Sequence, residues 1–135
     1  MKIEYCADII ALYNEQQIVV IERFTFPFGY ALPGGRRDRK ENGKLETVIE
    51  CAKREFKEET GLDLIIEGKL GIYDTIGRDP RGPKSSTVVY GQGTGILKNE
   101  IEKTHAFLMH LQDIDKNKEK FTFDHYQILC DYRKK

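Results

Sequence analysis

Glutamate residues cluster near the middle of the chain in a pattern that could bind a metal ion. Glu55, Glu58 and Glu59 stand at positions i, i+3 and i+4, so an α-helix would present all three on one face. Like charges on one face destabilise a free helix. A hard divalent cation such as Mg²⁺ would compensate them, since it prefers carboxylate oxygens and shares its shell with substrate phosphates. A solvated acidic helix face is the alternative interpretation of these three residues alone.

A glycine turn and a charged loop precede the glutamates. The apolar residues 30–32 lead into the Pro-Gly-Gly sequence at 33–35, and the mostly charged residues 36–45 follow before Glu46. Glycines let a backbone carbonyl approach a bound ion closely. The order predicts a strand, a glycine turn, a charged loop, and then a helix that carries Glu-x-x-Glu-Glu and ends at Gly61.

This arrangement resembles the Nudix box, the signature G-x5-E-x7-R-E-U-x-E-E-x-G-U in which U is aliphatic. The residues that fit its second half at the right spacings are Glu46, Arg54, Glu55, Glu58, Glu59 and Gly61, with Phe56 and Leu62 at the apolar positions. The first half departs from the signature, because Lys40 stands where the pattern has its glycine. A five-residue insertion between Gly35 and Glu46 accounts for this departure. On these residues the chain is identified as a member of the Nudix hydrolase family.

The resemblance implies a site for Mg²⁺, with Mn²⁺ as the alternative cation. Glu55, Glu58 and Glu59 would be its carboxylate ligands, with Glu55 and Glu58 also acting in catalysis, and Gly35 would offer its backbone carbonyl. Glu46, Arg54 and Gly61 would be structural, the first two as an ion pair that holds the ligands in register. A further acid from a later loop would serve as catalytic base: Glu100 and Glu102 are the candidates, Asp115 is a weaker one, and the sequence does not choose between the first two.

Segments outside the box resemble the ADP-ribose pyrophosphatase group of the family. They are Gly-Arg-Asp-Pro-Arg-Gly at 77–82, Phe-Asp-His at 123–125 and Phe-Pro-Phe-Gly at 26–29. Phe28 could stack on adenine, and Arg36, Arg78 or Arg81 could meet a phosphate or ribose. The basic loop 36–45 could serve phosphates in the same way or simply be solvated. The glycines at 91, 93 and 95 depart from the group's usual pattern.

The resemblance therefore implies hydrolysis of ADP-ribose to AMP and ribose 5-phosphate. Three alternatives keep the chemistry but change the substrate: nucleoside triphosphates, dinucleoside polyphosphates and nucleotide sugars. A fourth is a sensor that binds ADP-ribose without turnover. Intact carboxylates in the box favour an enzyme over a sensor.

The composition of the chain indicates which partners and which cellular compartment to expect. The 135 residues predict a single domain, 1–135, and 22 basic against 22 acidic residues leave no net field to attract nucleic acid or an acidic membrane. Cys6, Cys51 and Cys130 form no Cys-x-x-Cys pair and are expected to be reduced thiols. No apolar run approaches the length of a membrane span and the first residues do not resemble a signal peptide, so we expect a cytoplasmic protein with a small nucleotide as its partner. A homodimer is left open.

Hydrophobic patterning predicts mixed strands and two helices. The expected strands are 3–12, 17–25, 64–75, 87–90 and 105–111, with an irregular loop at 77–83. Helices are expected at 47–60, with Val48, Ala52 and Phe56 facing the core, and at about 124–133, with Ile128, Leu129 and Tyr132 inward. This α/β pattern suggests an α/β/α sandwich, and the resemblance implies the same Nudix-type sandwich with a mixed β-sheet.

Overall fold

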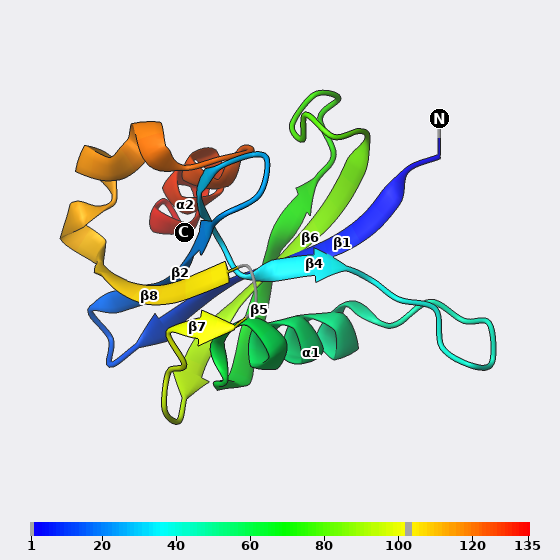
Figure 1. The fold of residues 1–135 in the computed structure, drawn as a ribbon, viewed down its shortest axis with the longest axis horizontal. Helices are drawn as coiled ribbons and strands as arrows, with labels where there is room; N and C mark the ends of the chain where they lie inside the picture. The colour runs from blue at the N-terminus through cyan, green and yellow to red at the C-terminus, as the bar shows by residue number, and fades with distance from the viewer. Residues whose placement is uncertain (1, 102–103) are drawn as a thin grey trace.

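A mixed β-sheet forms the middle layer of the protein, whose computed structural model describes residues 2–101 and 104–135. In chain order the elements are β1 (Glu4–Tyr13), β2 (Gln17–Arg23), β3 (Gly29–Ala31), β4 (Gly34–Arg36), α1 (Val48–Thr60), β5 (Asp63–Tyr73), β6 (Lys84–Thr94), β7 (Glu100–Ile101), β8 (Thr104–His110), the 3₁₀ turns η1 (Leu111–Asp113) and η2 (Asp115–Lys120), and α2 (His125–Arg133) (Figure 1). The described strands follow the order β5-β6-β1-β2-β8-β7, with β3 paired to β2 and β4 paired to β1. β1 and β6 run parallel, while the other pairs are antiparallel.

The two helices cover opposite faces of this sheet. Successive side chains of a strand point to opposite faces, and on β1 the buried Ala7 and Ile9 join the core that contains Phe56 of α1. Ile10, their neighbour, joins a second core that contains Leu129 of α2. The structure therefore has the expected α/β/α sandwich with a mixed sheet.

The sheet splits between β1 and β2. The two strands pair only beside their hairpin, at Leu12–Ile18 and Tyr13–Gln17. Beyond that point β1 pairs with β4, and β2 pairs with β3. The β3–β4 turn, which contains Pro33, connects the two short strands across the split. This opening matters because it brings residues of four strands close to the carboxylate face of α1.

Helix α1 is defined by strong signals at both ends. Thr47 accepts a hydrogen bond from the Glu50 N–H, and the Glu50 side chain accepts one from the Thr47 N–H, which makes a complete capping box. Gly61 ends the helix with φ +76°, a left-handed conformation that suits glycine. Ala52 and Phe56 are fully buried, as the apolar spacing predicts. The expected helix 47–60 is confirmed, with Thr47 as its N-cap.

The strand after the Gly77 loop is longer than predicted. The sequence predicts a strand at 87–90, but β6 runs from Lys84 to Thr94 and includes two glycines. A Cβ added at Gly93 would lie 3.1 Å from Cζ of Phe56 and 3.3 Å from Cδ1 of Leu62. The glycine therefore lets α1 pack closely on β6. The short strands β4 and β7 and the 3₁₀ turns were also missing from the sequence prediction.

Other predicted elements differ from the structure by one or two residues at most ends. The C-terminal helix begins at His125, with Ile128 and Leu129 buried and Tyr132 half-buried. The three cysteines are free thiols, as predicted. Among the described residues, no helix combines the length and apolar character that crossing a membrane requires.

Candidate active site

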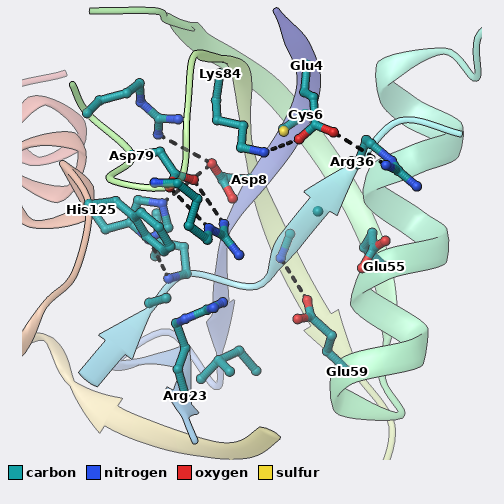
Figure 2. Close-up of a pocket in the computed structure, with 18 of the residues that line it drawn as sticks. Glu4, Cys6, Asp8, Arg23, Arg36, Glu55, Glu59, Asp79, Lys84 and His125 are labelled. Carbon is teal, nitrogen blue, oxygen red and sulfur yellow. Dashed lines mark hydrogen bonds and ion pairs between the residues drawn. The ribbon is translucent and has the colours of Figure 1, made fainter. Parts of the chain in front are cut away.

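A cavity of about 370 Å³ occupies the split in the sheet. Its walls come from β1, β2, the β3–β4 turn, the start of β6 and one face of α1, together with the loop before β6 and the segment before α2. Figure 2 shows acidic side chains from α1 on one side and a mixed set of acidic and basic groups on the other. The cavity thus joins the glutamate face of the box to the loops on either side of it.

Two glutamates of α1 form the acidic wall. The Glu59 carboxylate accepts a hydrogen bond from the Gly34 N–H at 2.8 Å. The pKa of Glu59 is raised to about 8, chiefly by burial; the hydrogen bond from Gly34 opposes this rise, and the nearby charges of Glu55 and Asp8 add to it. Burial also raises the pKa of Glu55, although Arg54 opposes the shift. For both carboxylates the effect of burial exceeds that of the neighbouring positive charge, so both pKa values are raised.

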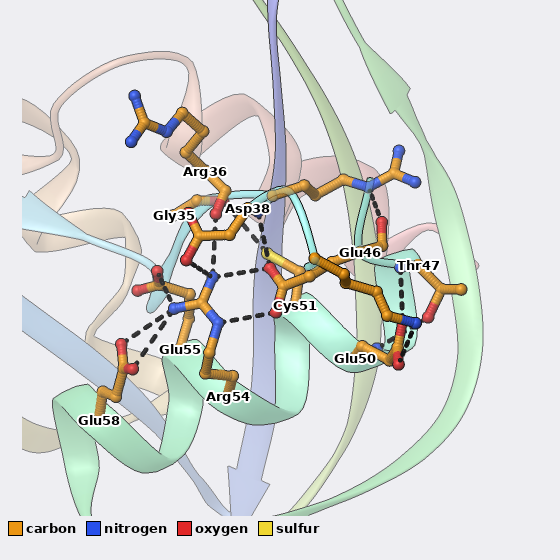
Figure 3. A network of polar contacts seen from close by, with 12 residues as sticks. Gly35, Arg36, Asp38, Glu46, Thr47, Glu50, Cys51, Arg54, Glu55 and Glu58 are labelled. Carbon is orange, nitrogen blue, oxygen red and sulfur yellow. Dashed lines mark hydrogen bonds and ion pairs between the residues drawn. The ribbon is translucent and has the colours of Figure 1, made fainter. Parts of the chain in front are cut away.

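Arg54 ties the box together (Figure 3). Its Nε and NH2 donate to the two oxygens of Glu46, both at 2.8 Å, which is the ion pair that the sequence analysis expected. NH1 donates to Glu55 at 2.9 Å and to Glu58 at 3.0 Å. NH2 also donates to the carbonyl of Arg36 at 3.1 Å. One guanidinium therefore fixes the loop, the helix start and two of the candidate ligands.

The same pairing lowers the pKa of Glu46 to about 2, chiefly through the hydrogen bonds from Arg54. The Glu46 side chain also accepts from the Asp38 N–H at 2.8 Å. Glu46 is 8% exposed, so it acts as a nearly buried clamp between the loop and the helix rather than as a group facing the cavity.

The residues of this wall fit a divalent cation. In the described part of the chain, no three His, Cys, Asp or Glu side chains are already gathered around a common metal position; Glu55 and Glu58 instead pair with Arg54. However, Glu55 lies against the backbone of Gly35, where an added Cβ would stand 2.5 Å from the carboxylate carbon. Two partly or fully buried carboxylates beside a bare glycine backbone are a donor set of hard oxygens, which Mg²⁺ and Mn²⁺ accept.

Cationic side chains face this acidic wall. Arg23, Arg36, Arg81 and Lys84 all line the cavity. Arg23 donates hydrogen bonds to the carbonyls of residues 26 and 27 and to a threonine hydroxyl, and none of these three acceptors is a carboxylate. Arg23 and Arg81 each place the guanidinium carbon 5.3 Å from the ring centre of Phe123. These groups can donate hydrogen bonds to the oxygens of a pyrophosphate.

A buried polar network forms the floor of the cavity. The Asp8 carboxylate accepts from the Ser86 hydroxyl at 2.6 Å and lies 3.5 Å from Nε2 of His125. Nδ1 of His125 accepts from the Leu32 N–H at 2.9 Å, which anchors the β3–β4 turn to α2. Burial alone would raise the pKa of Asp8, but His125, Ser86 and Arg78 together lower it. The carboxylate therefore stays ionised where it is fully enclosed.

Sequence reasoning did not place Asp8, Arg23, Lys84 or His125 in the site as functional side chains. Asp8 and Arg23 lie on strands whose apolar neighbours dominate the pattern, and only the split in the sheet brings them together. The Phe-Asp-His segment was the one available signal for His125.

Of the residues predicted to bind substrate, three line the cavity and one does not. Arg36 and Arg81 line the cavity. Arg78 also lines it, but its guanidinium donates to both oxygens of Asp124, at 2.9 and 2.7 Å, and its side chain is 5% exposed. Phe28 is 69% exposed and is not among the described residues that line the cavity.

The catalytic-base candidates remain predictions. The backbone of Glu100 lies in β7, while its side chain and the whole of Glu102 lie outside the described residues. Asp115 pairs with Arg133 and Tyr126 on the surface and does not line the cavity. Glu58 is exposed at the edge of the acidic wall, where Arg54 binds it.

Known proteins share this fold and this box. The NUDIX domain family matches residues 4–132. A Methanocaldococcus jannaschii protein named ADP-ribose pyrophosphatase is 38% identical over 122 residues, which cover 88% of this chain and 67% of that protein. The chain belongs to the NUDIX family and is a Nudix hydrolase.

Solved structures agree with the fold assignment. The NUDIX domain of Shewanella oneidensis NrtR complexed with ADP ribose has a TM-score of 0.82 at 20% identity, covering 99% of this chain and 88% of that chain. A bifunctional NMN adenylyltransferase/ADP ribose pyrophosphatase from Francisella tularensis, complexed with AMP and a manganese ion, has a TM-score of 0.81 at 23% identity. That match covers 96% of this chain and 40% of the larger protein. At these identities the likeness shows the fold alone.

Proposed function

We propose that this protein is a pyrophosphohydrolase, dependent on Mg²⁺ or Mn²⁺, that cleaves ADP-ribose to AMP and ribose 5-phosphate. The observation that carries the proposal is the arrangement of the cavity. Buried Glu55 and Glu59 stand on one wall, and Arg23, Arg81 and Lys84 stand on the others. A cavity with both charges suits a substrate whose pyrophosphate is bound partly through a cation and partly through arginine and lysine.

The chain's own residues supply binding and orientation. Arg81 and Lys84 would draw phosphate oxygens towards the acidic wall, and Glu55 and Glu59 would hold the cation, with Glu58 and the Gly35 carbonyl as further ligands. When bound, the cation would neutralise charge on the phosphates and make a water molecule more acidic. Arg54 and Glu46 would keep the glutamates in position. Glu100 and Glu102 stay the proposed candidates for the base.

The nucleotide assignment is supported by the relatives. The archaeal protein, at 38% identity, is named for ADP-ribose, and two similar folds were solved with ADP ribose or AMP. The Gly-Arg-Asp-Pro-Arg-Gly loop contributes Arg78, Asp79 and Arg81 to the cavity wall. We propose that this loop receives the ribose phosphate side of the substrate. A cytoplasmic location follows from the same proposal, because nucleotides of this kind are held inside cells.

The test is a substrate panel with identification of products by mass. Wild-type protein with Mg²⁺ would be given ADP-ribose, NADH, diadenosine polyphosphates, nucleoside triphosphates and nucleotide sugars. We expect ADP-ribose to yield AMP and ribose 5-phosphate in equal amounts. Glu55→Gln should lower kcat/KM for ADP-ribose by about 10²-fold or more, since it weakens the charge that holds the cation.

The matched control is Glu67→Gln, which changes an exposed glutamate on β5 away from the cavity and should leave turnover near wild type. If another compound of the panel is turned over faster than ADP-ribose, that compound is the preferred substrate and the ADP-ribose assignment is wrong. Absence of turnover, combined with a rise in melting temperature on adding ADP-ribose, would instead support a sensor.

A further inference from the structure

A second cavity of about 720 Å³ lies beside the candidate active site. It is bounded by the start of β1, the loop that follows β4, and residues 81–84. Five residues line both cavities: Glu4, Arg36, Asp38, Arg81 and Lys84. The two spaces therefore meet at a shared ring of charged groups, and we call the second one the basic groove.

Positive charge is in excess in the basic groove. Lys2, Arg37 and Arg39 line it without lining the first cavity. With the shared residues, this gives six cations against two carboxylates along its walls. The whole chain carries no net charge, so the excess is local and does not reflect the composition of the protein.

The two carboxylates of the groove already form ion pairs with other cationic side chains. Glu4 pairs with Lys84 and, at 3.4 Å, with Arg36. Asp38 lies 3.3 Å from the guanidinium of Arg54. Within the part of the chain that the structure describes, neither carboxylate forms an ion pair with Arg37 or Arg39, so these two residues keep their positive charge in the groove.

Arg37 and Arg39 bind only backbone oxygens among the described contacts. Nε of Arg37 donates to the carbonyl of Glu46 at 2.8 Å, and NH1 of Arg39 donates to the carbonyl of Gly43 at 3.0 Å. A guanidinium has five N–H donors in a planar fork. Each side chain is thus held in place by one bond and keeps further donors for an anion.

The loop that carries these arginines is a folded hairpin. Arg39 and Leu45 form an antiparallel bridge, and the Glu46 N–H donates to the Asp38 carbonyl at 2.7 Å. The Arg37 N–H donates to the carbonyl of Tyr5 at 2.8 Å, which continues the β1–β4 pairing into the loop. Figure 1 shows this hairpin projecting beyond β4, beside the start of α1. Its cations are therefore positioned before any ligand arrives.

We propose that the basic groove binds a third phosphate group, a monoester carried by the substrate on one of the two groups that flank its pyrophosphate. The inference deepens the proposed function, on which it rests for the ADP-ribose framework. A phosphate monoester carries close to two negative charges at neutral pH and is well matched by paired guanidinium groups. The preferred substrate would then be an ADP-ribose phosphorylated on one ribose.

Two compounds distinguish the two positions of the extra phosphate: ADP-ribose 2′-phosphate, phosphorylated on the adenosine ribose, and ADP-ribose 1″-phosphate, phosphorylated on the other ribose. Binding of each and of ADP-ribose would be measured by calorimetry on wild-type protein in EDTA, where no turnover occurs. We expect one phosphorylated compound to bind at least tenfold more tightly than ADP-ribose. That preference should weaken as salt concentration rises.

The variant Arg37→Gln/Arg39→Gln should abolish this preference, lowering the affinity ratio to about one. Its matched control is Lys44→Ala/Lys53→Ala, which removes the same charge at exposed positions outside both cavities and should keep the ratio. Circular dichroism and melting temperature would show that both variants are folded. A ratio below ten for both phosphorylated compounds in the wild type, a ratio unchanged in the arginine variant, or no binding of either phosphorylated compound would overturn the proposal. Failure of the proposed function would be seen separately, as absence of ADP-ribose turnover with Mg²⁺.

Discussion

The buried carboxylate of Glu59 lowers the stability of the metal-free protein. Its carboxylate is held in the cavity by the Gly34 N–H, and burial raises its pKa to about 8. Near that pH its ionised form is costly in the metal-free protein, because the charge has lost its water and lies near Glu55. A glutamine could keep the Gly34 hydrogen bond without the charge.

We therefore expect Glu59→Gln to raise the melting temperature of the metal-free protein by a few degrees, for a gain of about 1 kcal/mol. The same variant should lose most of the stabilisation that Mn²⁺ gives to the wild type. Thermal unfolding with a titration of Mn²⁺ measures both effects, with Glu67→Gln as the control. A variant that is less stable without metal and still fully stabilised by Mn²⁺ would show that Glu59 is not a ligand.

Glu46 gives the opposite case, in which a charge stabilises the fold. Its pKa is lowered from 4.5 to about 2, chiefly by hydrogen bonds from Arg54. A carboxyl whose pKa is lowered by folding stabilises the protein above its unfolded pKa, and this contribution is lost as pH falls from about 4.5 through about 2.

Glu46→Gln should thus cost about 2 kcal/mol of unfolding free energy at pH 7, since it removes the charge from three hydrogen bonds, two from Arg54 and one from the Asp38 N–H. The difference from wild type should shrink as pH falls below about 4.5. Urea unfolding of both proteins at pH 7 and pH 3 measures it. A difference of the same size at both values would mean that the charge of Glu46 is not what stabilises the clamp.

The residues that sequence could predict are those joined by local spacing. A helix sets the distance between Glu55 and Glu59, and the box sets Glu46 opposite Arg54, so both relations follow from positions along the chain. Asp8 and His125 are far apart in sequence and meet only because the sheet splits and α2 packs beneath the split. No periodicity within either segment specifies that meeting.

At the scale of elements, β6 depends on a glycine that sequence patterns mark as a break. Gly93 lies against Phe56 and Leu62, with distances of 3.1 and 3.3 Å from the position of an added Cβ. A β-branched side chain there would have to displace α1, which carries the acidic wall. The strand continues through Gly93 because its pairing with Leu64 of β5 is kept, which is why a prediction from propensity ended the strand too early.

Gly93→Val should lower the unfolding free energy by about 2 kcal/mol through overpacking and reduce kcat more than it changes substrate affinity. Gly71→Val is the matched control on the neighbouring strand, because an added Cβ there meets only one carbon of Tyr73 at 3.9 Å; its effect should be within about 0.5 kcal/mol. Chemical unfolding and steady-state kinetics test both variants. Equal losses in the two would mean that α1 is not displaced by contact at Gly93.

At the scale of the whole molecule, both helices depend on one sheet. Ile9 and Ile10 are adjacent residues of β1, yet the first packs in the α1 core and the second in the α2 core. His125 adds a polar link, since it joins α2 to the turn that positions Gly34. Loss of packing on the α2 face should therefore also destabilise α1, which carries the acidic wall on the other face of the sheet.

This coupling predicts a single cooperative unfolding transition. Leu129→Ala, at a fully buried position of the α2 core, should lower the unfolding free energy by about 3 kcal/mol. Urea unfolding followed by far-ultraviolet circular dichroism and by tyrosine fluorescence should give coincident curves for wild type and variant, with the same slope. Hydrogen exchange would show whether amides of α1 lose as much protection as amides of α2. If α1 kept its protection while α2 opened, the two faces would be separate cooperative units, and the site would depend on α2 only through the His125 hydrogen bond.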